Sequence, residues 1–202
     1  MTIGRLSALA MAFPFPAILV AGLCSADDGQ PRHDFQFFAG YSPVSATLIG
    51  TTRGRRLALA GFAYSYRCWS WNSLSVSYTA AAIPAAILIQ PYEPNAPSRA
   101  VYGFAVAPVG FTFGLARRHR VHPFVETAGG IVASTQPIPE NQPGASGLNF
   151  FFDLGGGLRW RLGRRGAVSL GYRFFHISNA GTTSFNPGVD NNVFYIGYSF
   201  LR

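Results

Sequence analysis

The sequence predicts an all-β chain that closes into an eight-stranded antiparallel transmembrane β-barrel. Charged residues make up only 12% of the 202 residues, about half of what a soluble domain carries, whereas hydrophobic residues make up 49%. Segments of about ten or more residues alternate apolar with polar or small side chains, as the strands of membrane barrels do. After residue 26 there is no run of about 18 apolar residues that would make a spanning helix. A closed barrel is the other structure that crosses a bilayer with its backbone polar groups satisfied.

The first 26 residues predict a cleaved signal peptide. Arg5 supplies the positive charge, an apolar stretch follows, and small residues precede a cleavage site after Ala26. A transmembrane anchor is the alternative, but two prolines interrupt the apolar stretch. The mature chain, 27–202, is then expected to form a single barrel domain. Cys68 would be its only cysteine, which excludes an intramolecular disulfide.

Four strands are expected in the first half of the mature chain. The first begins at residue 35 and is expected to continue beyond 41 to residue 48, before a turn. The second reads LALAGFAYSY, and the third begins with a clear alternation of apolar residues with serine and threonine. Pro108 predicts a bulge in the fourth, because proline has no N–H group for the ladder. These strands are expected over 35–48, 57–66, 73–89 and 101–115.

The second half of the chain predicts four more strands of the same kind. One face of each is apolar and largely aromatic, and the opposite face carries scattered charges. These charges would face the lumen as a salt-bridge network, since an unpaired buried charge is costly. The network is expected to contain Glu126, Asp153, Arg159, Arg161 and Arg173. The four strands are expected over 121–134, 148–162, 167–178 and 190–200.

The lengths of the connections support this arrangement. With both chain ends in the periplasm, the connections after the second, fourth and sixth strands become periplasmic, and these are short. The connections after the third, fifth and seventh strands are long, as expected for extracellular loops. The first extracellular connection, 50–55, is short and is the exception.

A small group of reactive residue types lies at the extracellular edge of the last two strands. Alternation from Leu170 and Tyr172 continues on the same face to His176 and Ser178. In the closing strand, the apolar face begins at Asp190 by the same count. A hairpin would place these faces side by side, on the lipid side of the barrel. Serine, histidine and a carboxylate are the residue types of a nucleophile, base and orienting acid.

The same stretch resembles a known family, the outer-membrane lipid A 3-O-deacylases of the PagL type, which are also described as acyloxyacyl hydrolases. The resemblance lies in the sequence HISNAG at 176–181, followed by NPG at 186–188 and an acid at 190. It implies an eight-stranded barrel in the Gram-negative outer membrane that cleaves the 3-position acyl ester of lipid A.

The resemblance also assigns roles to individual residues. Ser178 would be the nucleophile and His176 its general base. Asp190 would be the third member, where the family has a glutamate fourteen residues after the histidine. The backbone N–H groups of Asn179 and Gly181 would form the oxyanion hole.

The expected partners are therefore lipid A or lipopolysaccharide and the outer membrane, with a homodimer as a further possibility. No metal and no cofactor is expected, because no cluster of cysteine and histidine residues occurs. The net charge of +8 does not indicate nucleic acid, because the arginines are scattered. Two alternatives stay open: a non-catalytic structural or adhesive outer-membrane barrel, and a soluble lipid-binding barrel in the periplasm.

Overall fold

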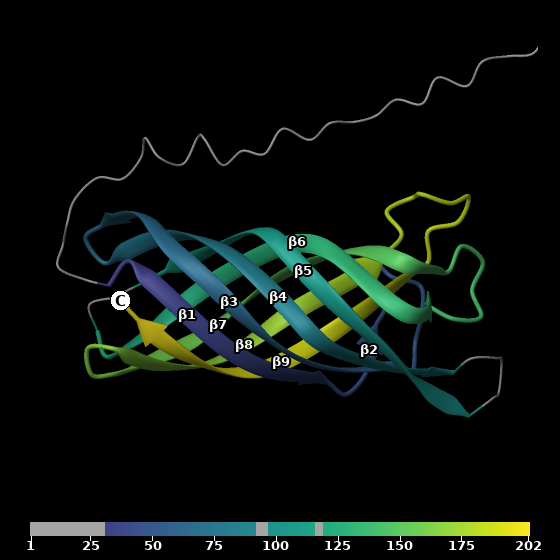
Figure 1. The fold of residues 1–202 in the computed structure, drawn as a ribbon, viewed down its shortest axis with the longest axis horizontal. Helices are drawn as coiled ribbons and strands as arrows, with labels where there is room; N and C mark the ends of the chain where they lie inside the picture. The colour runs from purple at the N-terminus through teal and green to yellow at the C-terminus, as the bar shows by residue number, and fades with distance from the viewer. Residues whose placement is uncertain (1–30, 92–96, 116–118) are drawn as a thin grey trace, which may run out of the picture.

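The computed structural model describes residues 31–91, 97–115 and 119–202, so the predicted signal peptide lies outside the described residues. The described chain forms one closed antiparallel barrel of eight long strands and one two-residue strand, β2 (Figure 1). The strands are β1 (His33–Ser42), β2 (Ser45–Ala46), β3 (Arg56–Trp71), β4 (Leu74–Pro91), β5 (Ser98–Gly114), β6 (Val121–Ile138), β7 (Ser146–Leu162), β8 (Gly166–Ser178) and β9 (Gly188–Leu201). The predicted fold class is confirmed.

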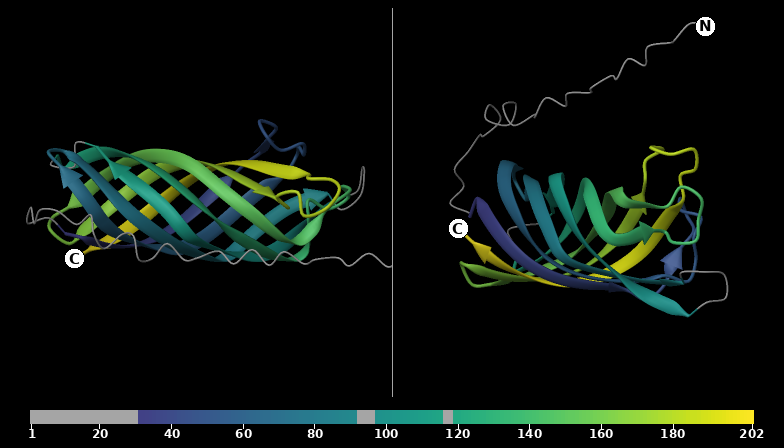
Figure 2. Two further views of the ribbon diagram at one scale, coloured as in Figure 1. Left: turned by 90° about the horizontal axis from the view of Figure 1, so that it is seen from above. Right: turned by 45° about the vertical axis from the view of Figure 1, so that its right-hand side comes forward.

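Each long strand pairs with its neighbours in the chain, and pairing of β1 with β9 closes the barrel. The connections β3–β4 and β7–β8 are tight turns at the end that carries the C-terminus. The longer connections leave the opposite end, where the loop between β8 and β9 extends beyond the wall (Figure 2). Short periplasmic turns and longer extracellular loops are the rule for such barrels, so we call the two ends periplasmic and extracellular.

The first strand differs from the sequence-based prediction. It ends at Ser42 rather than continuing to residue 48, and β2 then makes two pairs with β9, opposite Asp190 and Asn191. The chain leaves the sheet after β2, so the first extracellular connection is longer than predicted. The predicted bulge in β5 is confirmed by a register shift between Val106 and Val109 in its pairing with β6.

The two faces of the wall follow the alternation of the strands. In β9, the side chains of Phe194 and Ile196 are 59% and 55% exposed, whereas their neighbours on the opposite face, Val193 and Tyr195, are buried. Apolar side chains are exposed in this way on each of the eight long strands and form an outer surface suited to lipid. Within the described ranges, no helix is long and apolar enough to cross a membrane.

The lumen contains an ion pair between two members of the predicted network, Arg173 and Glu126. A third member, Arg159, pairs instead with Asp34, which the prediction did not include. Arg173 donates two hydrogen bonds to Glu126, at 2.8 and 3.1 Å, and the Tyr195 hydroxyl donates a third at 2.6 Å. Nearer the periplasmic end, Arg159 pairs with Asp34 at 2.8 Å. These bonds compensate for the cost of burying the charges, and the side chains fill the interior as expected for eight strands.

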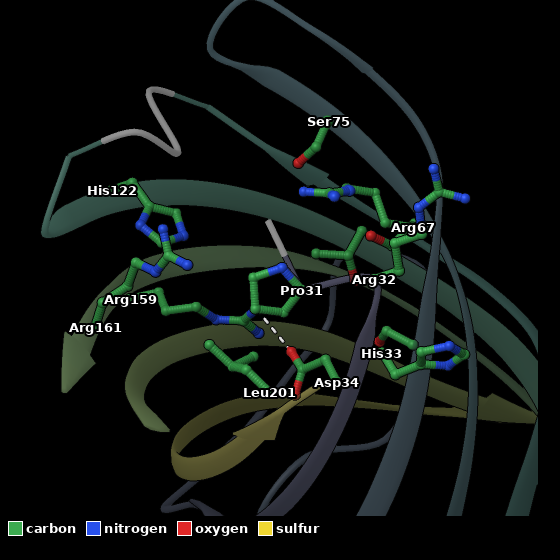
Figure 3. A pocket seen from close by; sticks show the side chains of 13 residues that line it. Pro31, Arg32, His33, Asp34, Arg67, Ser75, His122, Arg159, Arg161 and Leu201 are labelled. Atoms are coloured by element: carbon green, nitrogen blue, oxygen red, sulfur yellow. Dashed lines mark hydrogen bonds and ion pairs between the residues drawn. The ribbon is translucent and has the colours of Figure 1, made fainter. Parts of the chain in front are cut away.

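A cavity of about 90 Å³ opens at the periplasmic mouth of the barrel (Figure 3). Its lining includes four arginines, Arg32, Arg67, Arg159 and Arg161. The Arg159–Asp34 ion pair crosses the floor of this cavity in the close view. The cavity therefore belongs to the periplasmic end of the lumen, and the predicted reactive group lies at the other end, on the outer wall.

Candidate active site

The hairpin of β8 and β9 places His176 directly opposite Asp190. Both residues share the outward parity of Leu170 and Phe194, so their side chains project from the outer face of the wall. Paired residues on one face of an antiparallel sheet have side chains close enough to interact. The predicted juxtaposition of the histidine and the acid is therefore present in the structure.

The two side chains are joined by a short hydrogen bond, 2.6 Å from His176 Nδ1 to Asp190 Oδ1. Because an ionised carboxylate can only accept, the ring donates through Nδ1 and leaves Nε2 as an acceptor. The shorter side chain of aspartate, where the resemblance implies glutamate, thus still reaches the imidazole. Phe152 lies beside the ring, with 5.2 Å between the two ring centroids.

The second oxygen of Asp190 is held by the first extracellular connection. The backbone N–H groups of Leu48, Ile49 and Gly50 donate to Asp190 Oδ2 at 2.7, 2.7 and 2.9 Å. Asp190 is completely buried beneath them, although it lies on the outward face of its strand. Charge-assisted bonds to backbone N–H groups are among the stronger hydrogen bonds, so the carboxylate is fixed on both sides.

A second contact ties the same connection to the start of β9. The backbone carbonyl of Gly188 accepts from Thr51 N, from Thr52 N and, at 2.8 Å, from Thr52 Oγ1. A Cβ atom at Gly188 would lie 2.6 Å from Cε1 of His176, and one at Gly50 would lie 2.6 Å from the Gly188 carbonyl oxygen. Both positions therefore require glycine for the connection and the imidazole to pack this closely.

Ser178 lies two residues beyond His176, on the same face of β8, and its partner across the sheet is Gly188. It is 8% exposed, so it sits in the wall with little contact with solvent. Among the described residues, no hydrogen bond joins its Oγ to the His176 ring. Such bonds are often looser before substrate binds.

The side chain of Asn179 connects two extracellular loops. Its Nδ2 lies within 2.9 Å of the carbonyl oxygens of Gly144 and Phe185 and of Thr183 Oγ1. Its Oδ1 accepts a bond of 2.8 Å from the N–H group of Gly181. The Gly181 donor proposed for the oxyanion hole is thus engaged within its own turn.

The turn at residues 179–182 has a left-handed backbone at its two central residues. Ala180 and Gly181 have φ values of 53° and 76°, and Thr182 N donates to the Asn179 carbonyl at 3.1 Å. Two successive positive φ values are those of a type I′ turn, which glycine adopts without steric cost at its second central position.

In the part of the chain that the structure describes, no group of three or more metal-ligating side chains occurs.

Sequence reasoning missed the backbone of Leu48, Ile49 and Gly50 as part of the site. Residues 50–55 were predicted to be only a turn, and residue 48 the end of a strand. No residue type signals this contact, because the donors are backbone N–H groups, which every residue except proline carries.

Comparison with known proteins agrees with this architecture. The chain matches the sequence profile of the family described as "Lipid A 3-O-deacylase (PagL)" over residues 58–199. A search of curated protein sequences finds no match.

Several solved structures are similar, among them two with a TM-score above 0.5. The crystal structure of the outer membrane enzyme PagL shares 19% identity and a TM-score of 0.59, covering 81% of this chain and 97% of that one. Neisserial surface protein A shares 10% identity and a TM-score of 0.53, covering 83% of this chain and 96% of that one. The family match, which spans more than half of the chain, shows that this integral outer-membrane β-barrel belongs to the PagL family of lipid A deacylases.

Proposed function

We propose that the protein hydrolyses the acyl ester at the 3-position of lipid A, in the outer leaflet, by a Ser–His–Asp mechanism. The observation that carries this proposal is the hydrogen bond of 2.6 Å between His176 and Asp190 on the outer wall. A carboxylate that orients an imidazole beside a serine is the arrangement of many esterases. The outer wall at the extracellular end is also where a lipid of the outer leaflet meets the protein.

In this mechanism, His176 Nε2 takes the proton of the Ser178 hydroxyl as Oγ adds to the ester carbonyl carbon. Asp190 holds the ring in the required tautomer and stabilises the imidazolium that forms. Collapse of the tetrahedral intermediate breaks the ester bond, and the imidazolium gives its proton to the departing sugar oxygen. Water, activated by the same imidazole, then hydrolyses the acyl-serine and releases the fatty acid.

The tetrahedral oxyanion needs donors close to Ser178. We propose the backbone N–H group of Asn179, the residue after the nucleophile, as the first donor. Gly181 would contribute its N–H group only after releasing Asn179 Oδ1, to which it donates in the structure. The side-chain bonds of Asn179 to Gly144 and Phe185 support the turn that presents these groups.

The test is mass spectrometry of lipid A from cells that express the wild type, Ser178→Ala or Ser169→Ala. Ser169 lies in the same strand but is buried toward the lumen, where it accepts from Arg159, so it serves as a control. The wild type and Ser169→Ala should remove one acyl chain, and Ser178→Ala should reduce the rate by about 10⁴-fold or more.

Folding must be checked in parallel by the shift in gel mobility on heating. Unchanged lipid A in wild-type cells that contain the folded barrel would reject the proposal. It would favour the non-catalytic outer-membrane barrel. Loss of an acyl chain from another position would keep the mechanism but correct the regiospecificity.

A further inference from the structure

Two residues of the first extracellular connection expose unusually large apolar surfaces. Leu48 is 78% exposed, more than any other large hydrophobic side chain of the described residues, and Ile49 is 56% exposed. They do not belong to a strand, so the alternation of the barrel does not account for their exposure. Transfer of such exposed apolar surface from water to an apolar environment lowers the free energy, so these side chains are suited to contact with an apolar partner.

The backbone N–H groups of the same two residues hold the carboxylate of Asp190, the proposed orienting acid. Leu48 N and Ile49 N each donate to Asp190 Oδ2 at 2.7 Å, and Gly50 N donates at 2.9 Å. The 48–50 segment therefore has two sides. Its N–H groups face Asp190, and its side chains face away from the protein.

The position of Asp190 shows on which side of the wall this segment lies. Asp190 shares the outward parity of Phe194 and Ile196, which are exposed on the lipid face of β9. It is nevertheless fully buried, because the 48–50 segment covers its outer side. Leu48 and Ile49 thus lie on the outer wall, beside the His176–Asp190 pair. They continue the lipid-facing surface of β9 toward the extracellular end.

We propose that Leu48 and Ile49 form a lipid-contacting surface of the active site, which packs against acyl chains of the lipid substrate and thereby stabilises the contact of the 48–50 segment with Asp190. The identity of this lipid as lipid A rests on the proposed function. Two observations favour a lipid occupant over a protein: continuity with the lipid-facing surface, and the location at the extracellular end, where the outer leaflet surrounds the barrel. Binding of substrate and positioning of the acid are then coupled through one short segment.

The first test replaces the side chains and keeps the backbone donors, in the double variant Leu48→Gln/Ile49→Gln. Its matched control is Tyr102→Gln/Phe104→Gln, which removes two exposed apolar side chains from β5, on another part of the wall. The substrates are lipid A in phosphatidylcholine vesicles and a water-soluble p-nitrophenyl butyrate ester. The first variant should lower kcat/KM for lipid A about tenfold more than it lowers kcat/KM for the soluble ester, whereas the control should lower neither.

Equal kcat/KM values for lipid A in the wild type and the Leu48→Gln/Ile49→Gln variant would overturn the proposal. An equal loss of activity on both substrates would also overturn it, because the side chains would then be needed only for the structure of the site. If the wild type cleaves neither substrate, the proposed function itself fails.

The second test does not depend on catalysis. An environment-sensitive fluorophore is attached at Leu48→Cys, or at the exposed Arg53→Cys as a control, with Cys68 of the mature chain replaced by serine. In vesicles of lipid A and phosphatidylcholine with brominated acyl chains, the probe at 48 should be strongly quenched and the probe at 53 should not. Absence of quenching at 48 would overturn the proposal. The same holds if burial of the probe at 48 depends on protein concentration, since a second copy would then cover the segment.

Discussion

Two carboxylates, the partly buried Glu126 and the fully buried Asp190, lie on opposite sides of the barrel wall and differ in their partners. Glu126 faces the lumen and receives two hydrogen bonds from Arg173 and one from Tyr195. Asp190 faces outward and receives one from His176 and three from backbone N–H groups. Both oxygens of each carboxylate accept hydrogen bonds, so hydrogen bonding alone does not distinguish a structural carboxylate from a candidate catalytic one.

The two carboxylates differ in whether the side chain bound to them can still accept a proton. The guanidinium of Arg173 stays protonated and has no acceptor, so its pair with Glu126 can only hold the strands together. The imidazole of His176 uses one nitrogen for Asp190 and keeps the second as a proton acceptor beside Ser178. A buried carboxylate belongs to a candidate active site when the side chain that it orients can still accept a proton from a nucleophile.

The sharpest way to test this comparison is to neutralise each carboxylate in turn. Asp190→Asn should lower the rate of lipid A hydrolysis by about 10⁴-fold, because an amide stabilises the wrong tautomer of the imidazole and cannot stabilise the imidazolium. Glu126→Gln should leave the rate unchanged and lower the free energy of unfolding by about 3 kcal/mol, because it leaves Arg173 without its anion. The two quantities are measured by lipid A turnover in vesicles and by urea titration.

A loss of activity in a folded Glu126→Gln barrel would contradict the separation of the two sites. If that variant does not fold, Tyr195→Phe provides a milder change on the lumen side. It removes the bond of 2.6 Å to Glu126 and should cost about 1 kcal/mol without affecting turnover.

A smaller effect than that of Asp190→Asn is expected when alanine replaces a glycine beside the candidate site, in β9, and little change is expected when it replaces a glycine elsewhere in the wall, in β6. In Gly188→Ala the new Cβ would lie 2.6 Å from Cε1 of His176 and must displace the ring. Because displacement by about 1 Å can cost 100-fold, kcat should fall by roughly that factor. Gly129→Ala is the control, since its Cβ would meet only the Phe151 carbonyl oxygen, at an ordinary 3.7 Å. Equal kcat values in both variants would show that the position of the ring is not limiting.

The sequence was sufficient to place the strand-borne part of the site. Alternation requires only counting along a strand, and it put His176, Ser178 and Asp190 on one outward face, where the structure has them. The same counting assigned Arg173 and Glu126 to the lumen. Both results depend on residues within regular strands, where the position of a side chain follows from its number.

The part of the site made by loops could not be predicted in this way. The bond from Leu48 N to Asp190 joins residues that are 142 positions apart and uses a backbone group that every residue except proline carries. No residue type therefore signals it. The engagement of the Gly181 N–H group by Asn179 depends likewise on the turn conformation, which the motif alone does not specify.

The smallest expected effect concerns a single hydroxyl group that links the first extracellular connection to β9. Thr52→Val removes the bond of 2.8 Å from Thr52 Oγ1 to the Gly188 carbonyl, and Thr127→Val removes a bond of 2.7 Å to the Asp153 carbonyl within the wall. Each should lower the free energy of unfolding by about 1 kcal/mol. Only Thr52→Val should also slow lipid A hydrolysis, by up to about fivefold, since its hydroxyl helps to hold the donors of Asp190. If both variants lose the same stability and neither loses activity, the backbone bonds of Thr51 and Thr52 to Gly188 are enough to hold the connection.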